Sequence, residues 1–61
     1  MIDFLFMDSY TGEYFFVELT KGSHLSEAIS VLAEYGILEE MCEFICIVSE
    51  EEANILGYDT Y

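Results

Sequence analysis

The first twenty residues alternate in a way that is typical of two β-strands joined by a turn. Residues 2–8 and 13–20 carry apolar or aromatic side chains at every second position, such as Phe4 and Phe6 in the first segment. The polar residues between them end at Gly12, which suits a turn position with positive φ. The pattern therefore predicts a β-hairpin.

The period changes from two to between three and four after Lys21-Gly22. Apolar side chains then recur at i, i+3, i+4 and i+7, which predicts an amphipathic helix. Its apolar stripe consists of Leu25, Ala28, Ile29 and Leu32. We expect Ser23 to be the N-cap and Gly36 to end the helix in a left-handed conformation.

Residues 41–49 are apolar nearly throughout, which predicts a third strand. Its second half is apolar at consecutive positions, so we expect a central strand that is buried on both faces. Ser49, followed three residues later by Glu52, matches a capping box. A short helix should run from there through Leu56 and stop at Gly57, leaving residues 58–61 as a tail held by its tyrosines.

The predicted order is β-β-α-β-α in one compact α+β domain spanning residues 1–61. The simplest architecture is a three-stranded antiparallel sheet with one main helix and a short C-terminal helix, the third strand lying antiparallel beside the first. One helix covers only one face of a sheet. Either the second helix or a second subunit must cover the other, and for so small a domain we expect a homodimer.

The charge balance narrows the possible partners. The 61 residues include thirteen Asp and Glu, one Lys and no Arg, giving a formal net charge of -12. Phosphate contacts need Lys or Arg, so direct binding to nucleic acid or to an anionic membrane is excluded. No apolar run reaches the length of about 18 residues that spans a membrane, and the N-terminal segment lacks the basic flank of a signal peptide. Two cysteines are too few for a disulfide scaffold, so we expect reduced thiols and a cytoplasmic location.

Candidate chemistry is sparse. The usual parts of a nucleophilic site are limited to His24, Cys42 and Cys46. On a regular strand the two cysteines share a face about 13 Å apart, too far for a shared metal ion or a disulfide. We expect inert, reduced core thiols. The sequence predicts no catalytic residue, no metal site and no cofactor, and a protein that is not an enzyme.

The acids themselves are the candidate functional feature. Self-repulsion at a net charge of -12 destabilises a small fold, whereas solubility needs a charge magnitude of only about 2–8. Carboxylates interleaved with exposed tyrosines resemble phosphates among stacked bases, so the expected partner is a basic nucleic-acid-binding protein. The expected partner-binding residues are Glu27, Glu34, Tyr35, Glu39, Glu40, Glu43, Glu50, Glu51, Glu52 and Asp59.

Three segments carry a resemblance to a known family: 12–16 (GEYFF), 21–27 (KGSHLSE) and 35–36 (YG). They are similar to the short uracil-DNA glycosylase inhibitor of phi29-like phages. In general character the chain resembles small acidic DNA mimics of phages and mobile elements, including anti-restriction and anti-CRISPR proteins.

That resemblance implies a homodimer whose acidic and aromatic groove takes the DNA-binding loop of an enzyme. It also implies that Glu27 and Glu34 flank the groove, that Tyr35 lines it, and that the cytoplasm is that of an infected bacterial host. The chain departs from the family in its helix length, its run of three glutamates at 50–52 and its tail.

A second hypothesis is a non-mimic interaction module or adaptor. It would bind a partner through an apolar sheet face that includes Phe4 and Phe16, and it would do so as a homodimer. A third hypothesis, an enzyme or metal protein, has no motif in its favour.

Overall fold

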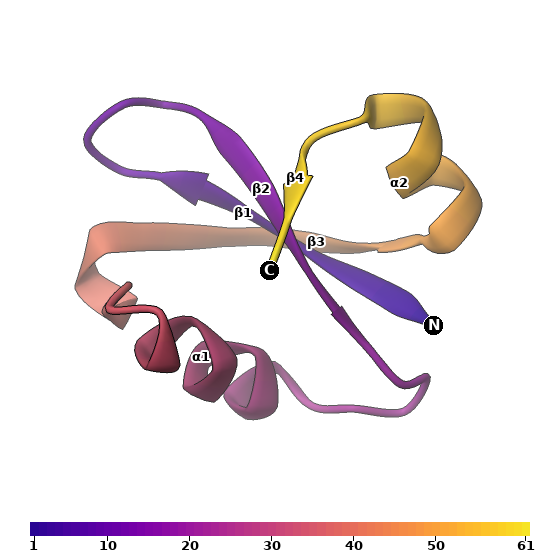
Figure 1. Ribbon diagram of the computed structural model, residues 1–61, viewed down its shortest axis with the longest axis horizontal. Helices are drawn as coiled ribbons and strands as arrows, with labels where there is room; N and C mark the ends of the chain where they lie inside the picture. The colour runs from indigo at the N-terminus through magenta and orange to yellow at the C-terminus, as the bar shows by residue number, and fades with distance from the viewer.

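The computed structural model describes residues 1–61, and its elements follow the predicted α+β order with additions (Figure 1). The elements are β1 (Ile2–Asp8), β2 (Tyr14–Leu19), α1 (Leu25–Glu34), the 3₁₀ helix η1 (Glu39–Met41), β3 (Cys42–Ser49), α2 (Glu50–Leu56) and β4 (Asp59–Thr60). Neither α-helix is long and apolar enough to cross a membrane.

The sheet has four strands in the order β3-β1-β2-β4 and is mixed, so the expectation of three antiparallel strands was incomplete. β1 pairs antiparallel with β2 and with β3, as predicted. The addition is β4, which pairs parallel to β2 and places Asp59 beside Phe15 and Thr60 beside Phe16. The amide of Tyr61 continues this pairing by donating to the carbonyl of Phe16 at 2.8 Å. Two residues are too few for alternation to reveal a strand.

The hairpin between β1 and β2 is closed by Asp8. Its Oδ1 accepts the amides of Tyr10 at 2.8 Å and Thr11 at 3.1 Å, and its carbonyl accepts the amide of Gly12 at 2.8 Å. Gly12 has a φ of 76°, the left-handed conformation expected from the sequence. The aspartate therefore serves the turn rather than a solvated surface alone.

The first helix begins one residue later than expected. His24, and not Ser23, is the N-cap residue, and its amide donates to Glu27 Oε2 at 3.3 Å. The glutamate at the third helical position thus satisfies a backbone donor that the helix leaves free. The C-terminal end is as predicted, because Gly36 follows the helix with a φ of 80°.

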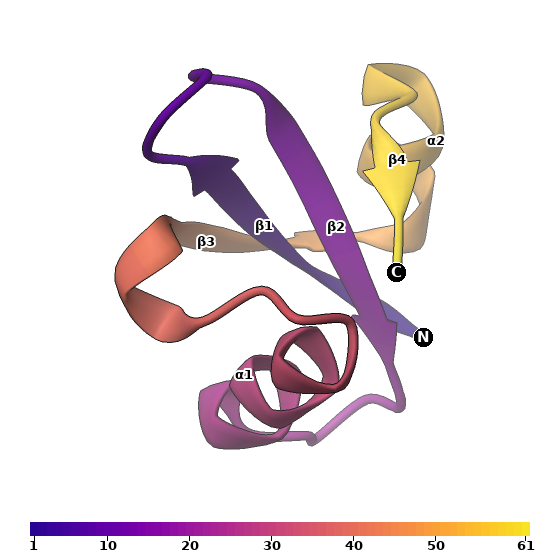
Figure 2. The ribbon, with the colours of Figure 1, turned by 60° about the vertical axis from the view of Figure 1, so that its left-hand side comes forward.

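Both faces of the sheet are covered, each by one helix (Figure 2). α1 packs Ala28 and Leu32 on the larger core, whose buried residues from the sheet are Phe4, Phe6, Phe15 and Val17. α2 packs Ala53 on Leu5 and Phe16. Ser49 caps α2 by accepting the amide of Glu52 at 3.2 Å, as expected. The second helix therefore covers part of the face that the first leaves open.

β3 corrects the expectation of a central strand buried on both faces. It is an edge strand, bonded only to β1, and most of its side chains are exposed. A β-bulge interrupts it, because Phe6 pairs with Phe44 whereas Leu5 pairs with Cys46. The bulge also sets Cys42 and Cys46 on opposite faces, so they do not share a face and Cys46 is not a core thiol.

Asp3 is the one buried polar residue, at 2% exposure, and its Oδ2 has no hydrogen-bond partner. Burial, reinforced by the carboxylates of Glu18 and Glu50, raises the pKa of Asp3 above its ordinary value. A group whose folded-state pKa is raised contributes most stability below its unfolded pKa. That contribution is lost as the pH rises through the folded pKa. Deprotonation of Asp3 therefore destabilises the fold as the pH rises.

Replacing Asp3 by Asn should raise the free energy of unfolding at neutral pH. The expected gain is about 1–3 kcal/mol, because Asn removes the buried charge and its repulsion by the carboxylates of Glu18 and Glu50. Stability should also vary less with pH between about pH 4 and 7. Urea titrations at several pH values measure both quantities, with the exposed Asp59→Asn as the matched control. Equal effects of the two substitutions would contradict a specific burial penalty at Asp3.

Candidate functional site

The ten residues expected to bind a partner are all exposed, but they lie on five different elements and do not form one site. Glu27 and Glu34 belong to α1, with Tyr35 directly after it. The others lie in η1 (Glu39 and Glu40), β3 (Glu43), the first turn of α2 (Glu50, Glu51 and Glu52) and β4 (Asp59). Glu27 is also part of the start of α1, since it accepts the His24 amide.

The C-terminal strand brings tyrosines from the tail against the hairpin. On the α2 side of the sheet, the ring of Tyr58 stacks on Tyr14 with 5.4 Å between centroids and lies 5.6 Å from the ring of Phe16. On the α1 side, the ring of Tyr61 meets Phe15 edge-on at 5.4 Å. The tyrosine rings of the tail therefore contact β2 on both faces of the sheet, as the sequence predicted.

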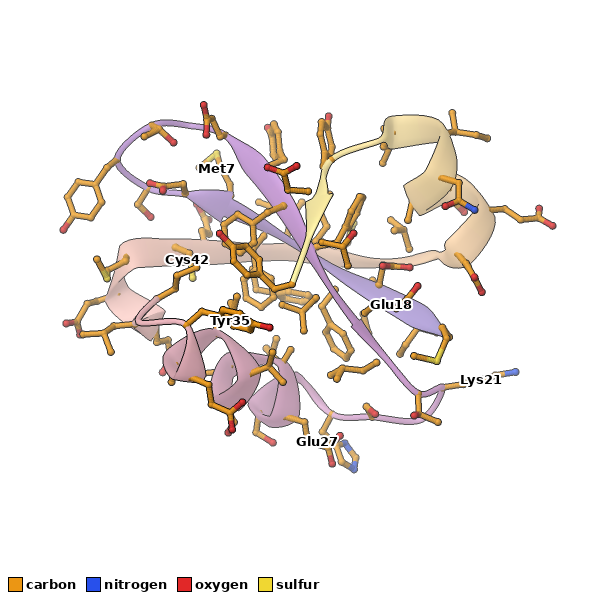
Figure 3. All side chains as sticks on the ribbon, in the orientation of Figure 1. Met7, Glu18, Lys21, Glu27, Tyr35 and Cys42 are labelled. Carbon is orange, nitrogen blue, oxygen red and sulfur yellow. The ribbon has the colours of Figure 1, made fainter.

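Tyr35 joins this cluster from the end of α1. Its ring lies 5.2 Å from that of Tyr61 in an edge-to-face arrangement, and yet 62% of the residue is exposed. Figure 3 shows Tyr35 between α1 and the sheet, whereas Glu27 lies at the other end of the helix. Of the predicted site residues, Tyr35 and Asp59 are thus the two that the fold brings to the same aromatic region.

Two adjoining hollows mark this region. One has a volume of about 140 Å³ and is lined by carboxylates and tyrosines together with Phe15, Ile37, Met41 and Cys42. The other, about 390 Å³ and more open, lies across Tyr14 and Glu13 from it and reaches Gly57. We call the carboxylates and tyrosines of their lining the tyrosine face. It consists of Asp8, Tyr10, Glu13, Tyr14, Tyr58, Asp59 and Tyr61.

The carboxylates of the protein are almost entirely without cationic partners. The only ion pair joins the terminal amine of Met1 to Glu50 at 3.9 Å, and both groups are exposed. Thirteen carboxylates less that one leave twelve unpaired. Lys21, the single basic side chain apart from His24, extends away from the molecule beyond the end of β2 (Figure 3). The tyrosine face therefore lies in a negative potential that no neighbouring cation neutralises.

A third hollow, of about 240 Å³, has a different character. It lies between α1 and β3, where the helix leaves the edge of the sheet uncovered, and its lining is mostly apolar. The lining includes Leu25 and Ile29 from the helix and Phe44 from the strand, with Glu39 and Glu43 at the margin. This groove is an apolar surface beside an acidic rim.

The arrangement offers little to covalent chemistry. Burial raises the pKa of the Cys42 thiol, and the carboxylates of Asp8 and Glu39 raise it further, so the thiol stays protonated and unreactive. No three side chains of the His, Cys, Asp and Glu types are grouped closely enough to hold a metal ion. What the site can do is bind, through carboxylates and aromatic rings, a partner that carries positive charge.

The tyrosine face contains six residues that the sequence pattern did not assign to a common site: Asp8, Tyr10, Glu13, Tyr14, Tyr58 and Tyr61. Tyr58 and Tyr61 reach the hairpin through β4, which is too short for its pairing to be seen in the sequence.

Comparison of the chain with protein families, curated proteins and solved structures finds no significant match.

Tyr58→Ala should release the tail and destabilise the fold. Tyr58 makes two ring contacts, and each aromatic pair contributes about 0.5–1.5 kcal/mol beyond its buried area. We expect a loss of about 1–3 kcal/mol in the free energy of unfolding, measured by urea titration. Tyr10→Ala is the control, since Tyr10 is 79% exposed and makes no ring contact. A Tyr58 variant as stable as the Tyr10 variant would show that the tail is not held by its rings.

Proposed function

We propose that this protein is an acidic DNA-mimic inhibitor. It occupies the basic nucleic-acid-binding site of a host defence or repair protein, such as a CRISPR effector, a restriction enzyme or a uracil-DNA glycosylase. The tyrosine face is the contact surface. The single observation that carries the proposal is that carboxylates and tyrosines gather around the hairpin end and the β4 edge of the sheet, in two hollows that share Glu13, Tyr14 and Asp59, with no cation of the chain to pair them.

The chemistry of that surface suits a nucleic-acid channel. Lysine and arginine side chains that otherwise contact phosphates can contact Asp8, Glu13 and Asp59, and arginine also stacks on tyrosine rings. Tyrosine is among the residue types that most often dominate the energy of an interface. The rings of Tyr58 and Tyr61 are already held by β2, so a partner orders few additional side chains on binding.

The remaining acids have a different role in this proposal. Glu34 and Glu51 are exposed and line none of the three hollows. Charges outside a contact act through the long-range field, which speeds the encounter of oppositely charged proteins. We therefore assign the dispersed acids to steering and the tyrosine face to contact.

An alternative function, a non-mimic interaction module, is favoured by a separate observation. The apolar sheet face that was expected to bind a partner is not accessible. Phe4 is 0% exposed beneath α1, and Phe16 is 1% exposed beneath α2. The apolar surface that does lie open is the groove beside β3. A module that binds there would hold its partner with little dependence on salt.

Affinity capture from bacterial lysate with mass spectrometry identifies the partner, and binding kinetics then test the proposal. Because the contact is ionic, affinity should fall steeply between about 50 and 500 mM salt. The double variant Glu13→Gln, Asp59→Asn should dissociate at least about tenfold faster than the unaltered protein. Neither side chain makes an internal hydrogen bond, so the fold should be retained.

The matched control is Glu34→Gln, Glu51→Gln, which removes the same charge outside the tyrosine face. It should slow association modestly and leave the dissociation rate unchanged. Binding that is insensitive to salt, or equal dissociation rates for the two double variants, would contradict the proposal. Salt-insensitive binding would favour the alternative module.

A further inference from the structure

The outer side of β3 is an unprotected sheet edge. Proteins usually guard an exposed edge strand with lysines, prolines, inward-pointing charges or very short length. β3 has eight residues, neither Lys nor Pro, and a single charge at Glu43. Its bulge is the one protective device present. Phe44, Ile45 and Ile47 are 37%, 43% and 50% exposed, so the edge offers apolar side chains as well as free backbone groups.

We propose that a second copy of this chain pairs with this edge, antiparallel and about a two-fold axis, so that two four-stranded sheets become one continuous sheet. The proposal does not depend on the proposed function, since the tyrosine face lies at the hairpin and tail, and β4 is at the opposite edge of the sheet. It identifies what covers the apolar groove between α1 and β3.

The bulge makes β3 complementary to itself in a register whose axis lies between two residues. Phe44 and Ile47 stand opposite Phe6 and Phe4 of β1, so both lie on the α1 face of the sheet although they are three residues apart. Directly opposed residues of an antiparallel pair share a face. An axis between Ile45 and Cys46 satisfies this rule, because Phe44 then faces Ile47 of the second copy.

Registers centred on Ile45 or on Cys46, the other two near the middle of the strand, do not satisfy it. They would set Phe44 opposite Cys46 or Val48 of the second copy, and both of these lie on the α2 face, opposite Leu5 and Asp3 of β1. The register with its axis between Ile45 and Cys46 also aligns the whole strand, from Cys42 to Ser49.

In this register the larger core continues across the junction between the two β3 strands. The ring of Phe44 already lies 5.6 Å from that of Phe6 and 6.2 Å from that of Phe4. Pairing brings Phe44 and Ile47 of one copy beside Ile47 and Phe44 of the other, on the same face as the groove at Leu25. Four half-exposed apolar side chains would thereby leave water together, which is the favourable term for association.

The two paired β3 strands would carry almost no charge, because Glu43 is the only charged residue of each strand. Acidic residues lie just beyond both strand ends. Glu43 faces Val48 of the second copy, so the two Glu43 side chains are five residues, or about 17 Å, apart. That exceeds the Debye length of about 8 Å at physiological salt. Beyond the strand ends, the acids of η1 in one copy lie toward the acidic first turn of α2 in the other. The repulsion of two chains of charge -12 opposes the dimer, so salt should strengthen it.

Analytical ultracentrifugation over a range of concentrations, at about 50 and 500 mM salt, tests the proposal. The expected result is a monomer–dimer equilibrium that shifts toward dimer as salt rises, opposite in sign to the salt effect on a basic partner. Ile47→Lys should raise the dimer Kd at least about tenfold. Ile55→Lys is the matched control, because Ile55 is 85% exposed on α2 and should leave the Kd unchanged. A monomer at millimolar concentration and high salt, or equal effects of the two variants, would overturn the proposal.

Cross-linking tests the register without relying on a destabilising variant. The proposed axis places the two Cys46 Cα atoms about 6 Å apart, within disulfide range, and the two Cys42 Cα atoms about 24 Å apart. Under a mild oxidant, which accepts two electrons as the two thiols lose their protons, Cys42→Ser should form a covalent dimer through Cys46. Cys46→Ser should stay monomeric on a denaturing gel. Cross-linking through Cys42 that is as fast as through Cys46 would overturn the register.

Failure of this proposal and failure of the proposed function have different signatures. A chain that stays monomeric can still bind a basic protein in a salt-weakened manner. A chain that dimerises through β3 can still lack such a partner.

Discussion

Like-charge repulsion is the constraint under which the rest of this protein is arranged. Thirteen carboxylates and one lysine give a net charge of -12, and the fold that carries them buries only ten of its 61 residues. A core of that size offers little surplus stability against self-repulsion. Twelve of the thirteen carboxylates accordingly lie at exposed or half-buried positions, and Asp3 is the exception.

The same constraint explains which contacts hold the fold together. Ion pairs are nearly absent, so cohesion comes from aromatic packing and from hydrogen bonds that use carboxylates locally. Asp8 closes the hairpin and Glu27 satisfies the amide of His24, while the tail is fixed by the rings of Tyr58 and Tyr61. Fixing the tail with tyrosines leaves the adjoining carboxylates free for a partner. The surface that stabilises the end of the chain is thus also the surface proposed to bind.

Local pattern predicted much of the fold. Alternation identified the hairpin and its two faces, and the stripe at Leu25, Ala28, Ile29 and Leu32 identified the face of α1 that packs on the sheet. Caps at Ser49 and stops at Gly36 and Gly57 were also correct, because turn and cap chemistry is local. The N-cap of α1 was wrong by one residue, where His24 and Ser23 compete without a decisive local signal.

The features that pattern did not predict depend on contacts distant in sequence. β4 has two residues, and only the return of the chain across β2 creates it. β3 is apolar at successive positions, a pattern that indicates burial without indicating which chain provides the cover. Its edge position leaves Ile45 and Ile47 half-exposed in one copy, and pairing with a second copy would reconcile the pattern with the structure. The ten acidic and aromatic site residues were correctly expected to be exposed, but their distribution over five elements required the fold.

If the tyrosine face takes the place of DNA on a basic protein, this protein and duplex DNA must compete for one site. The most direct measurement is whether a captured partner can hold duplex DNA and this protein at the same time, determined by mass photometry of the three-component mixture. DNA mimicry predicts two binary complexes and no ternary complex, with excess duplex displacing this protein. A ternary complex containing all three components would contradict it.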